Sequence, residues 1–125
     1  MAADIITASV STGLVDATST FYICHGQSGE WKLTSLKLVP HIATTADGSN
    51  KYVLAFTQGS DTVATSHDTA ANALVAGTVV GLTLTGTAGS AAVFGETDSV
   101  KVVATETGTK TFNVDLVATF EKYRA

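Results

Sequence analysis

The stretch that decides the fold is residues 112–120, which read Phe-Asn-Val-Asp-Leu-Val-Ala-Thr-Phe. Its even positions are all apolar, whereas Asn113, Asp115 and Thr119 stand between them and only Val117 breaks the alternation. Successive side chains of a β-strand point to opposite faces of the sheet, so this period predicts a strand with one buried face. We therefore expect one core to hold Phe112, Val114, Leu116, Ala118 and Phe120.

The same alternation recurs in other segments of the chain. Apolar residues occupy alternate positions at 52–56, 80–84 and 100–104, and short strands are expected at 21–24 and 5–10. The breaks between these segments contain Gly, Asp, Asn and Ser, which are typical of tight turns. Short strands at regular spacing predict an all-β protein, an antiparallel β-sandwich with the jelly roll as the expected topology. A small barrel is the alternative.

Two local features modify the pattern in residues 31–40. Between Trp31 and Val39 the apolar positions change from odd to even. One extra residue near 34–35 returns the buried set to the same face, so a β-bulge is expected there. Pro40, the only proline, is expected at the end of this strand or on a sheet edge because it has no N–H to donate.

The domain organisation follows from the length of 125 residues, which suits one hydrophobic core. We expect residues 1–20 to form an N-terminal arm with a weak first strand, and residues 21–125 to form a single β-sandwich domain. At most one short helix is expected, two turns at 68–76, with Gly77 as its end signal.

The composition excludes several classes of function. The net charge is −4 and the seven basic residues form no run, which argues against nucleic-acid binding. No stretch approaches the roughly 20 apolar residues that span a membrane, and the start of the chain lacks the features of a secretion signal. Cys24 is the only cysteine and has no partner for an intrachain disulfide. Synthesis and folding in the cytoplasm are expected.

The residue types that carry catalysis or bind metals are present but lack a catalytic spacing. His25, His41 and His67 include no His-x-His pair, and no carboxylate lies two residues from any of them. Cys24 and His25 are neighbours on a strand and point to opposite faces, so we interpret Cys24 as a small buried residue and His25 as the strand end. We predict no catalytic residues, no metal and no cofactor, and hence no enzyme.

Other polar and aromatic groups also have simpler structural explanations. The Asp-Gly-Ser-Asn at 47–50 is interpreted as a hairpin turn rather than a calcium loop, and the Gly-rich 86–90 as a flexible connection. Glu96 and Asp98 are expected side by side on a solvated face. The aromatic side chains considered for a sugar-binding platform are assigned mainly to the core: Tyr22, Trp31 and Tyr52.

Several features together resemble the small jelly-roll and β-sandwich decoration, or cement, proteins of tailed-bacteriophage heads. They are the arm at 1–20, the strands rich in Thr, Ala and Gly, the turn at 94–98 before the strand at 100–103, and the final strand ending at 120–124. The resemblance implies a virion protein on the capsid exterior that binds the major capsid protein and stabilises the shell. It also implies a homo-oligomer, with a trimer as the expected form.

The resemblance transfers no binding residues, so the expected contacts come from the sequence of the arm. A small sandwich is not expected to bury the apolar area of the arm alone. We expect a partner to bury these apolar residues: Ile5, Ile6, Val10, Leu14 and Val15. The alternative function is a carbohydrate-binding or adhesion module with a β-sandwich fold. That alternative predicts an exposed aromatic cleft with polar neighbours.

Overall fold

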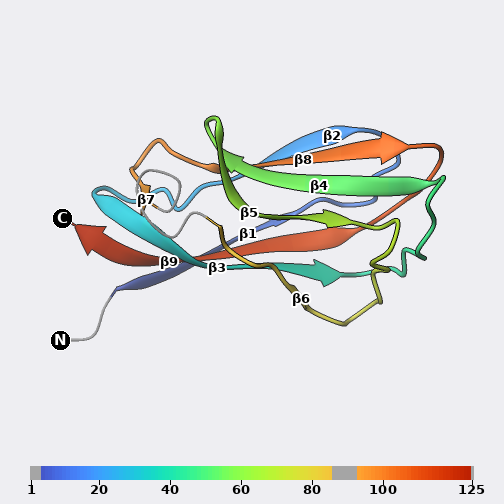
Figure 1. Cartoon of the computed structure of the whole chain (residues 1–125). Coiled ribbons are helices and arrows are strands. Elements are labelled where there is room, and N and C mark those ends of the chain that lie inside the picture. The colour runs from blue at the N-terminus through green and yellow to red at the C-terminus, as the bar shows by residue number, and fades with distance from the viewer. Residues whose placement is uncertain (1–3, 86–92, 125) are drawn as a thin grey trace.

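The computed structural model describes residues 4–85 and 93–124, which form nine strands and no helix. Two antiparallel sheets pack face to face as a β-sandwich, and both chain ends lie at the same end of the molecule (Figure 1). No described segment is a helix long and apolar enough to cross a membrane. The all-β sandwich expected from the alternating pattern is confirmed.

Each sheet has a defined strand order. The first, here called the β1 sheet, runs β1 (Ile5–Ser11), β9 (Val114–Arg124), β3 (Glu30–Pro40) and β6 (Val80–Gly81), and β7 (Val93–Phe94) also pairs with β3. The second, here called the β2 sheet, runs β2 (Ser19–Ile23), β8 (Val100–Thr107), β4 (Lys51–Gln58) and β5 (Asp61–Asp68).

The strand pairs are nested along the chain. β4 pairs with β5, β3 with β6, β2 with β8 and β1 with β9, and all four pairs are antiparallel. The chain therefore folds back on itself about the β4–β5 hairpin, and successive outer pairs alternate between the two sheets. This nested pairing over two packed sheets is the jelly-roll topology.

The core lies between the sheets and contains the residues that the alternation assigned to it. The five even-numbered residues from Phe112 to Phe120 are fully buried. The β2 sheet contributes the buried faces of β4 and β8, and the Tyr52 and Phe112 rings meet edge to face with centroids 4.6 Å apart. The expected bulge is present as a register shift between Leu33 and Ser35, and Pro40 is the last residue of β3.

The helix expected at 68–76 is wrong. Leu74 and Thr44 instead exchange two backbone hydrogen bonds, each 2.8 Å long, and the Tyr52 N–H donates to the hydroxyl of Thr69. The bond from the Asn72 N–H to the Asp68 carbonyl is the one helix-like contact that this segment makes. A helix this short has little stability of its own, so pairing with distant strands decides its conformation.

Residues 80–85 close one side of the sandwich. Val80 and Gly81 pair with β3, and the Leu82 N–H donates to the Leu36 carbonyl. The chain then crosses to the other sheet, where backbone bonds join Thr83 and Thr85 to β5. This segment therefore covers the edges of both sheets, and its alternate apolar side chains pack partly buried against the core, as expected: Val80, Leu82 and Leu84.

Candidate interaction surface

His25 is a structural residue inside the core. Its Nδ1 accepts the Gln27 N–H at 3.0 Å, so the ring proton is on Nε2, which donates to the Phe94 carbonyl at 3.2 Å. The ring also packs against Trp31 and Phe120. Both ring nitrogens are occupied, which leaves none for a substrate or a metal.

The expected burial of Cys24 is a second correction. Cys24 is exposed, whereas Ile23 and His25 on either side of it are buried. The alternation of β2 continues two residues beyond the strand, which ends at Ile23, and it turns the thiol of Cys24 outward and the imidazole of His25 inward. A polar ring can be buried here because two backbone groups satisfy its nitrogens.

The other two histidines lie apart from His25. His67 is buried and its Nε2 lies 3.1 Å from the Asn72 carbonyl. His41 is exposed and its Nε2 lies 3.0 Å from Asp115; this hydrogen bond lowers the pKa of Asp115, and the Ser11 hydroxyl acts in the same direction. No group of three or more His, Cys, Asp or Glu side chains gathers as a metal site within residues 4–85 and 93–124.

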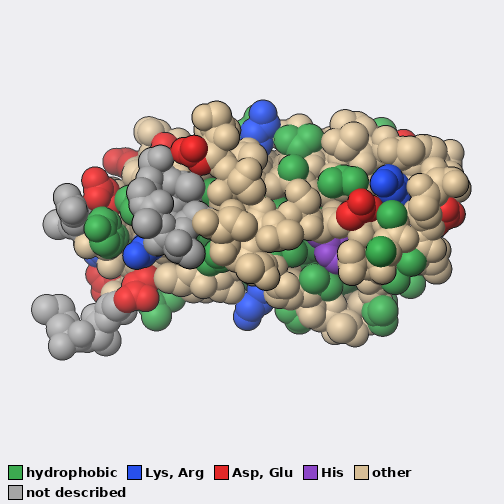
Figure 2. All heavy atoms as spheres, in the orientation of Figure 1, with side chains coloured by type: hydrophobic (Ala, Val, Ile, Leu, Met, Phe, Trp, Pro, Cys, Tyr) green, Lys and Arg blue, Asp and Glu red, His purple; other side chains and the backbone are tan. Residues whose placement is uncertain are grey.

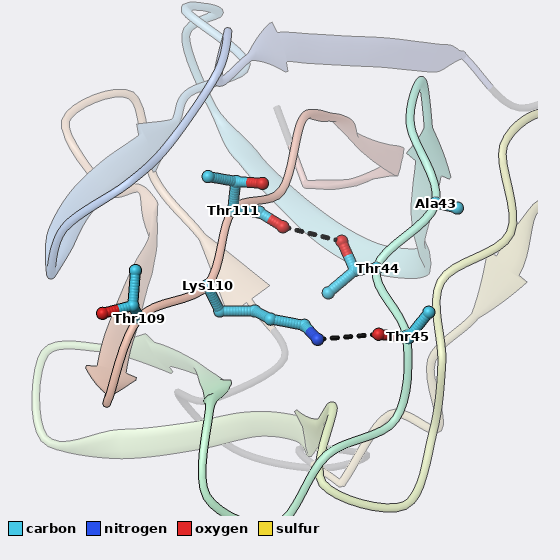
Figure 3. A pocket seen from close by; sticks show the side chains of 6 residues that line it. All are labelled: Ala43, Thr44, Thr45, Thr109, Lys110 and Thr111. Atoms are coloured by element: carbon cyan, nitrogen blue, oxygen red, sulfur yellow. Dashed lines mark hydrogen bonds between the residues drawn. The ribbon is translucent and has the colours of Figure 1, made fainter.

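The end of the sandwich opposite the termini carries a shallow hollow (Figure 3). One wall is formed by residues 43–45, which follow β3, and the other by residues 109–111 between β8 and β9. The Lys110 ammonium donates to the Thr45 hydroxyl at 2.8 Å, and the Thr44 hydroxyl donates to the Thr111 carbonyl at 2.9 Å. The hollow has hydrogen-bonding walls, and its one ionisable lining residue is already bonded across it.

The Asp-Gly turn braces this end of the molecule. The Asp47 carboxylate accepts the Ser49 and Asn50 N–H groups at 2.8 and 3.2 Å, and these bonds, Ser49 first, lower the pKa of Asp47. The Asn50 side-chain carbonyl accepts the Thr109 N–H at 2.9 Å. The turn therefore holds the β8–β9 loop in place. The hairpin expected at 47–50 is wrong, however, because β3 and β4 on either side of it belong to different sheets and do not pair.

Replacement of Gly108 by Ala is expected to destabilise the protein more than replacement of Gly13 by Ala. Both glycines have positive φ, 71° and 64°, which costs an alanine about 1–2 kcal/mol. A Cβ at Gly108 also overlaps the Asn50 side chain and the Ser49 carbonyl, whereas one at Gly13 meets open space. Urea melts of the two variants measure the difference, and equal losses would contradict the close approach of this loop to Asn50.

The five residues expected to bind a partner do not form one patch. Ile5 and Leu14 are 64% and 66% exposed, but Ile5 begins β1 and Leu14 lies in the loop beyond its other end. Ile6 and Val10 are partly buried against the core. Val15 is a core residue and exchanges two backbone hydrogen bonds with Phe112. Of the five side chains, only those of Ile5 and Leu14 are largely accessible.

A different grouping of exposed apolar side chains emerges from the tertiary structure. The surface here called the loop end comprises residues 12–18, 41–50, 69–79 and 107–113. Backbone hydrogen bonds join Val15 to Phe112 and Thr44 to Leu74, and Gly77 is bonded to Pro40 at the end of β3. The loop end carries three large apolar side chains that are more than half exposed: Leu14, Val75 and Val79. Sequence reasoning found Leu14 and missed the two valines, because Val75 lies in the segment expected to be helical and Val79 follows it.

The remaining surface is poor in charge. Figure 2 shows a face formed mostly by uncharged polar side chains and backbone, with Lys, Arg, Asp and Glu gathered mainly near the end where the chain termini lie and few elsewhere. Of the aromatic side chains considered for sugar binding, Trp31 and Tyr52 are buried and Tyr22 is exposed on the outer face of β2. Tyr123 is exposed on the other sheet. Comparison of the chain with protein families, curated proteins and solved structures found no match.

Proposed function

We propose that this chain is a structural protein that attaches to the exterior of a viral capsid and stabilises it. The observation that carries the proposal is the loop end, which carries the exposed apolar side chains of Leu14, Val75 and Val79 and also the threonine-lined hollow. Exposed apolar side chains with polar neighbours suit contact with another protein. The partner in this proposal is the major capsid protein.

The physical character of the chain supports a role in assembly. Charged residues make up 14% of the sequence, so a contact over its surface requires little removal of charge from water. Linking copies into an oligomer lets one assembly contact several identical sites of a shell, which strengthens attachment without any new type of contact. A jelly roll held by antiparallel strand pairs presents its loops on a rigid scaffold.

The carbohydrate-binding alternative has less support from the same surfaces. A sugar site needs aromatic rings that converge with polar groups. Tyr22 and Tyr123 are the described aromatics that are about half exposed or more, and they belong to the outer faces of different sheets. The hollow at the loop end contains no aromatic residue in its lining.

The test is co-sedimentation of the purified protein with capsids from the same source that lack it. The variants Leu14→Asp and Val75→Asp are expected to weaken binding at least about tenfold, because each places a carboxylate in an apolar contact. Tyr22→Asp is the matched control, since Tyr22 and Val75 are both 56% exposed but lie on different surfaces. Failure of the wild-type protein to sediment with capsids, or an equal loss with Tyr22→Asp, would refute the proposal.

A further inference from the structure

The two long sides of the sandwich differ in how their strand edges are covered. On one side residues 80–85 pair with both β3 and β5. On the other side β1 and β2 are the outermost strands of their sheets. β1 pairs with β9 along its whole length, and no other strand in residues 4–85 and 93–124 pairs with it. Such an edge presents a row of N–H and carbonyl groups to any further strand.

Two hydrogen bonds establish which backbone groups of β1 point outward. The Lys122 N–H donates to the Asp4 carbonyl at 2.9 Å, and the Thr12 N–H donates to the Val114 carbonyl at 3.0 Å. In an antiparallel ladder alternate residues bond to the same neighbour, so the even residues from 4 to 12 face β9. The odd residues of β1 therefore direct both backbone groups away from the sheet: Ile5, Thr7, Ser9 and Ser11.

This edge lacks the features that prevent strands from pairing. Its seven residues include no charged residue and no proline, and its register with β9 is unbroken from Ile5 to Ser11. Natural edge strands usually carry a lysine, a proline or a bulge. Ile6, Ala8 and Val10 remain only partly buried, whereas the β9 residues opposite them are fully buried. Apolar area is therefore still available along this edge.

We propose that two copies of this chain pair through their β1 edges, antiparallel, about a two-fold axis beside Ala8. In this register Ile5 lies opposite Ser11 and Thr7 opposite Ser9, so the outward backbone groups of each copy meet those of the other. Ile6 lies opposite Val10 on the core side. The two β1 sheets then form one continuous sheet, with both β2 sheets on the same side of it.

The odd and even alternation of backbone direction along β1 suits pairing with a second copy of the same strand. A two-fold axis beside any residue of β1 relates two antiparallel copies of the strand and places odd residues opposite odd residues. The odd residues are the ones whose backbone groups point away from β9. The axis at Ala8 is the one that pairs the whole strand, and it brings together no like charges because β1 has none. The edge of β2 is a weaker candidate, since β2 is shorter and its core-facing Ile23 is already fully buried.

This inference is independent of the proposed function, because it concerns the β1 edge rather than the loop end. It also differs from the trimer that the resemblance implied. When two copies pair through their β1 edges, neither copy has a free β1 edge left. The assembly therefore closes at a dimer.

The direct test combines solution mass with amide exchange. Sedimentation is expected to show a species of twice the 12.8 kDa chain mass. The amides of Thr7 and Ser9 are expected to exchange slowly in the dimer and rapidly on dilution to monomer, because their protection comes from the second copy. A protein that stays monomeric at high concentration, or an oligomer in which these two amides exchange rapidly, would overturn the proposal.

Charges introduced on β1 distinguish a loss of dimer pairing from a loss of folding. The double variant Thr7→Lys with Ser9→Lys places like charges opposite each other across the axis and is expected to weaken dimerisation at least about tenfold. Mixing it with Thr7→Glu, Ser9→Glu is expected to restore a dimer that contains one copy of each. Thr105→Lys, on the exposed face of an interior strand, is the control and is expected to remain dimeric.

A proline variant tests the direction of the backbone groups. Ser9→Pro removes an N–H that points away from β9, so its thermal melt as a monomer is expected to stay near that of the diluted wild type while dimerisation is lost. Persistence of the dimer in Ser9→Pro, or failure of the Lys and Glu variants to pair when mixed, would contradict the proposed register.

Discussion

Deletion of residues 1–11 is expected to abolish cooperative folding of this protein. The deletion removes β1, which pairs with β9 from Ile5 opposite Glu121 to Ser11 opposite Asp115. It also removes the side chains of Ile6, Ala8 and Val10 from the margin of the core. The loss is expected to be comparable to the total stability of a small domain, about 5–15 kcal/mol. Circular dichroism during thermal and urea unfolding measures it.

Deletion of residues 1–3 alone is the matched control for this experiment. It leaves every described contact of β1 in place, so its melting curve is expected to follow that of the full chain. A protein that lacks residues 1–11 and still unfolds in one sharp transition at the wild-type midpoint would show that β1 is dispensable.

This expectation changes the role that the sequence suggested for residues 1–20. We interpreted the segment as an arm whose apolar side chains bind a partner. A strand is present at Ile5–Ser11, as expected from its weak alternation, but it is an integral edge of the β1 sheet. A truncation designed to test attachment therefore also removes part of the fold, which is why single substitutions at the loop end provide the cleaner test.

Leu116→Ala is expected to lower the free energy of unfolding by about 2–5 kcal/mol, the range for a buried leucine that leaves a cavity. Leu116 is fully buried in β9, between Val10 of β1 and Leu38 of β3. The close packing of all three strands limits how far the neighbours can move to fill the space. Urea unfolding of the variant at equilibrium measures the loss.

Asn113→Ala is the matched control and is expected to cost less than about 1 kcal/mol. Asn113 belongs to the opposite set of positions and is only half-buried, and its side-chain oxygen has no hydrogen-bond partner in the described residues. Removal of an unpaired polar group gives up little interaction energy. Equal losses at Leu116 and Asn113 would contradict the observed register of β9.

The sequence predicted the features that depend on local periodicity. The alternation at 112–120 identified five fully buried residues, and the change of phase between Trp31 and Val39 located the bulge at Leu33/Ser35. These features could be read from one strand because the pleat itself turns successive side chains to opposite faces. The position of Pro40 followed in the same way from its missing N–H.

The candidate surfaces could be predicted only in part. Leu14 and Ile5 were identified as apolar residues without an assigned core position, and both are exposed. The sequence did not show that β1 separates the two side chains, nor did it group Leu14 with Val75 and Val79. That grouping depends on hydrogen bonds between segments tens of residues apart in the chain.

The sequence by itself determined that this protein is built of strands with one buried face, and which side chains most of those faces bury. The tertiary structure decided how the strands pair, and with it the conformation of 68–76, the burial of His25 and the open edge of β1. The physical reason is that backbone hydrogen bonds between strands carry no side-chain signature. Which distant segment satisfies them is settled only when the whole jelly roll closes over one core.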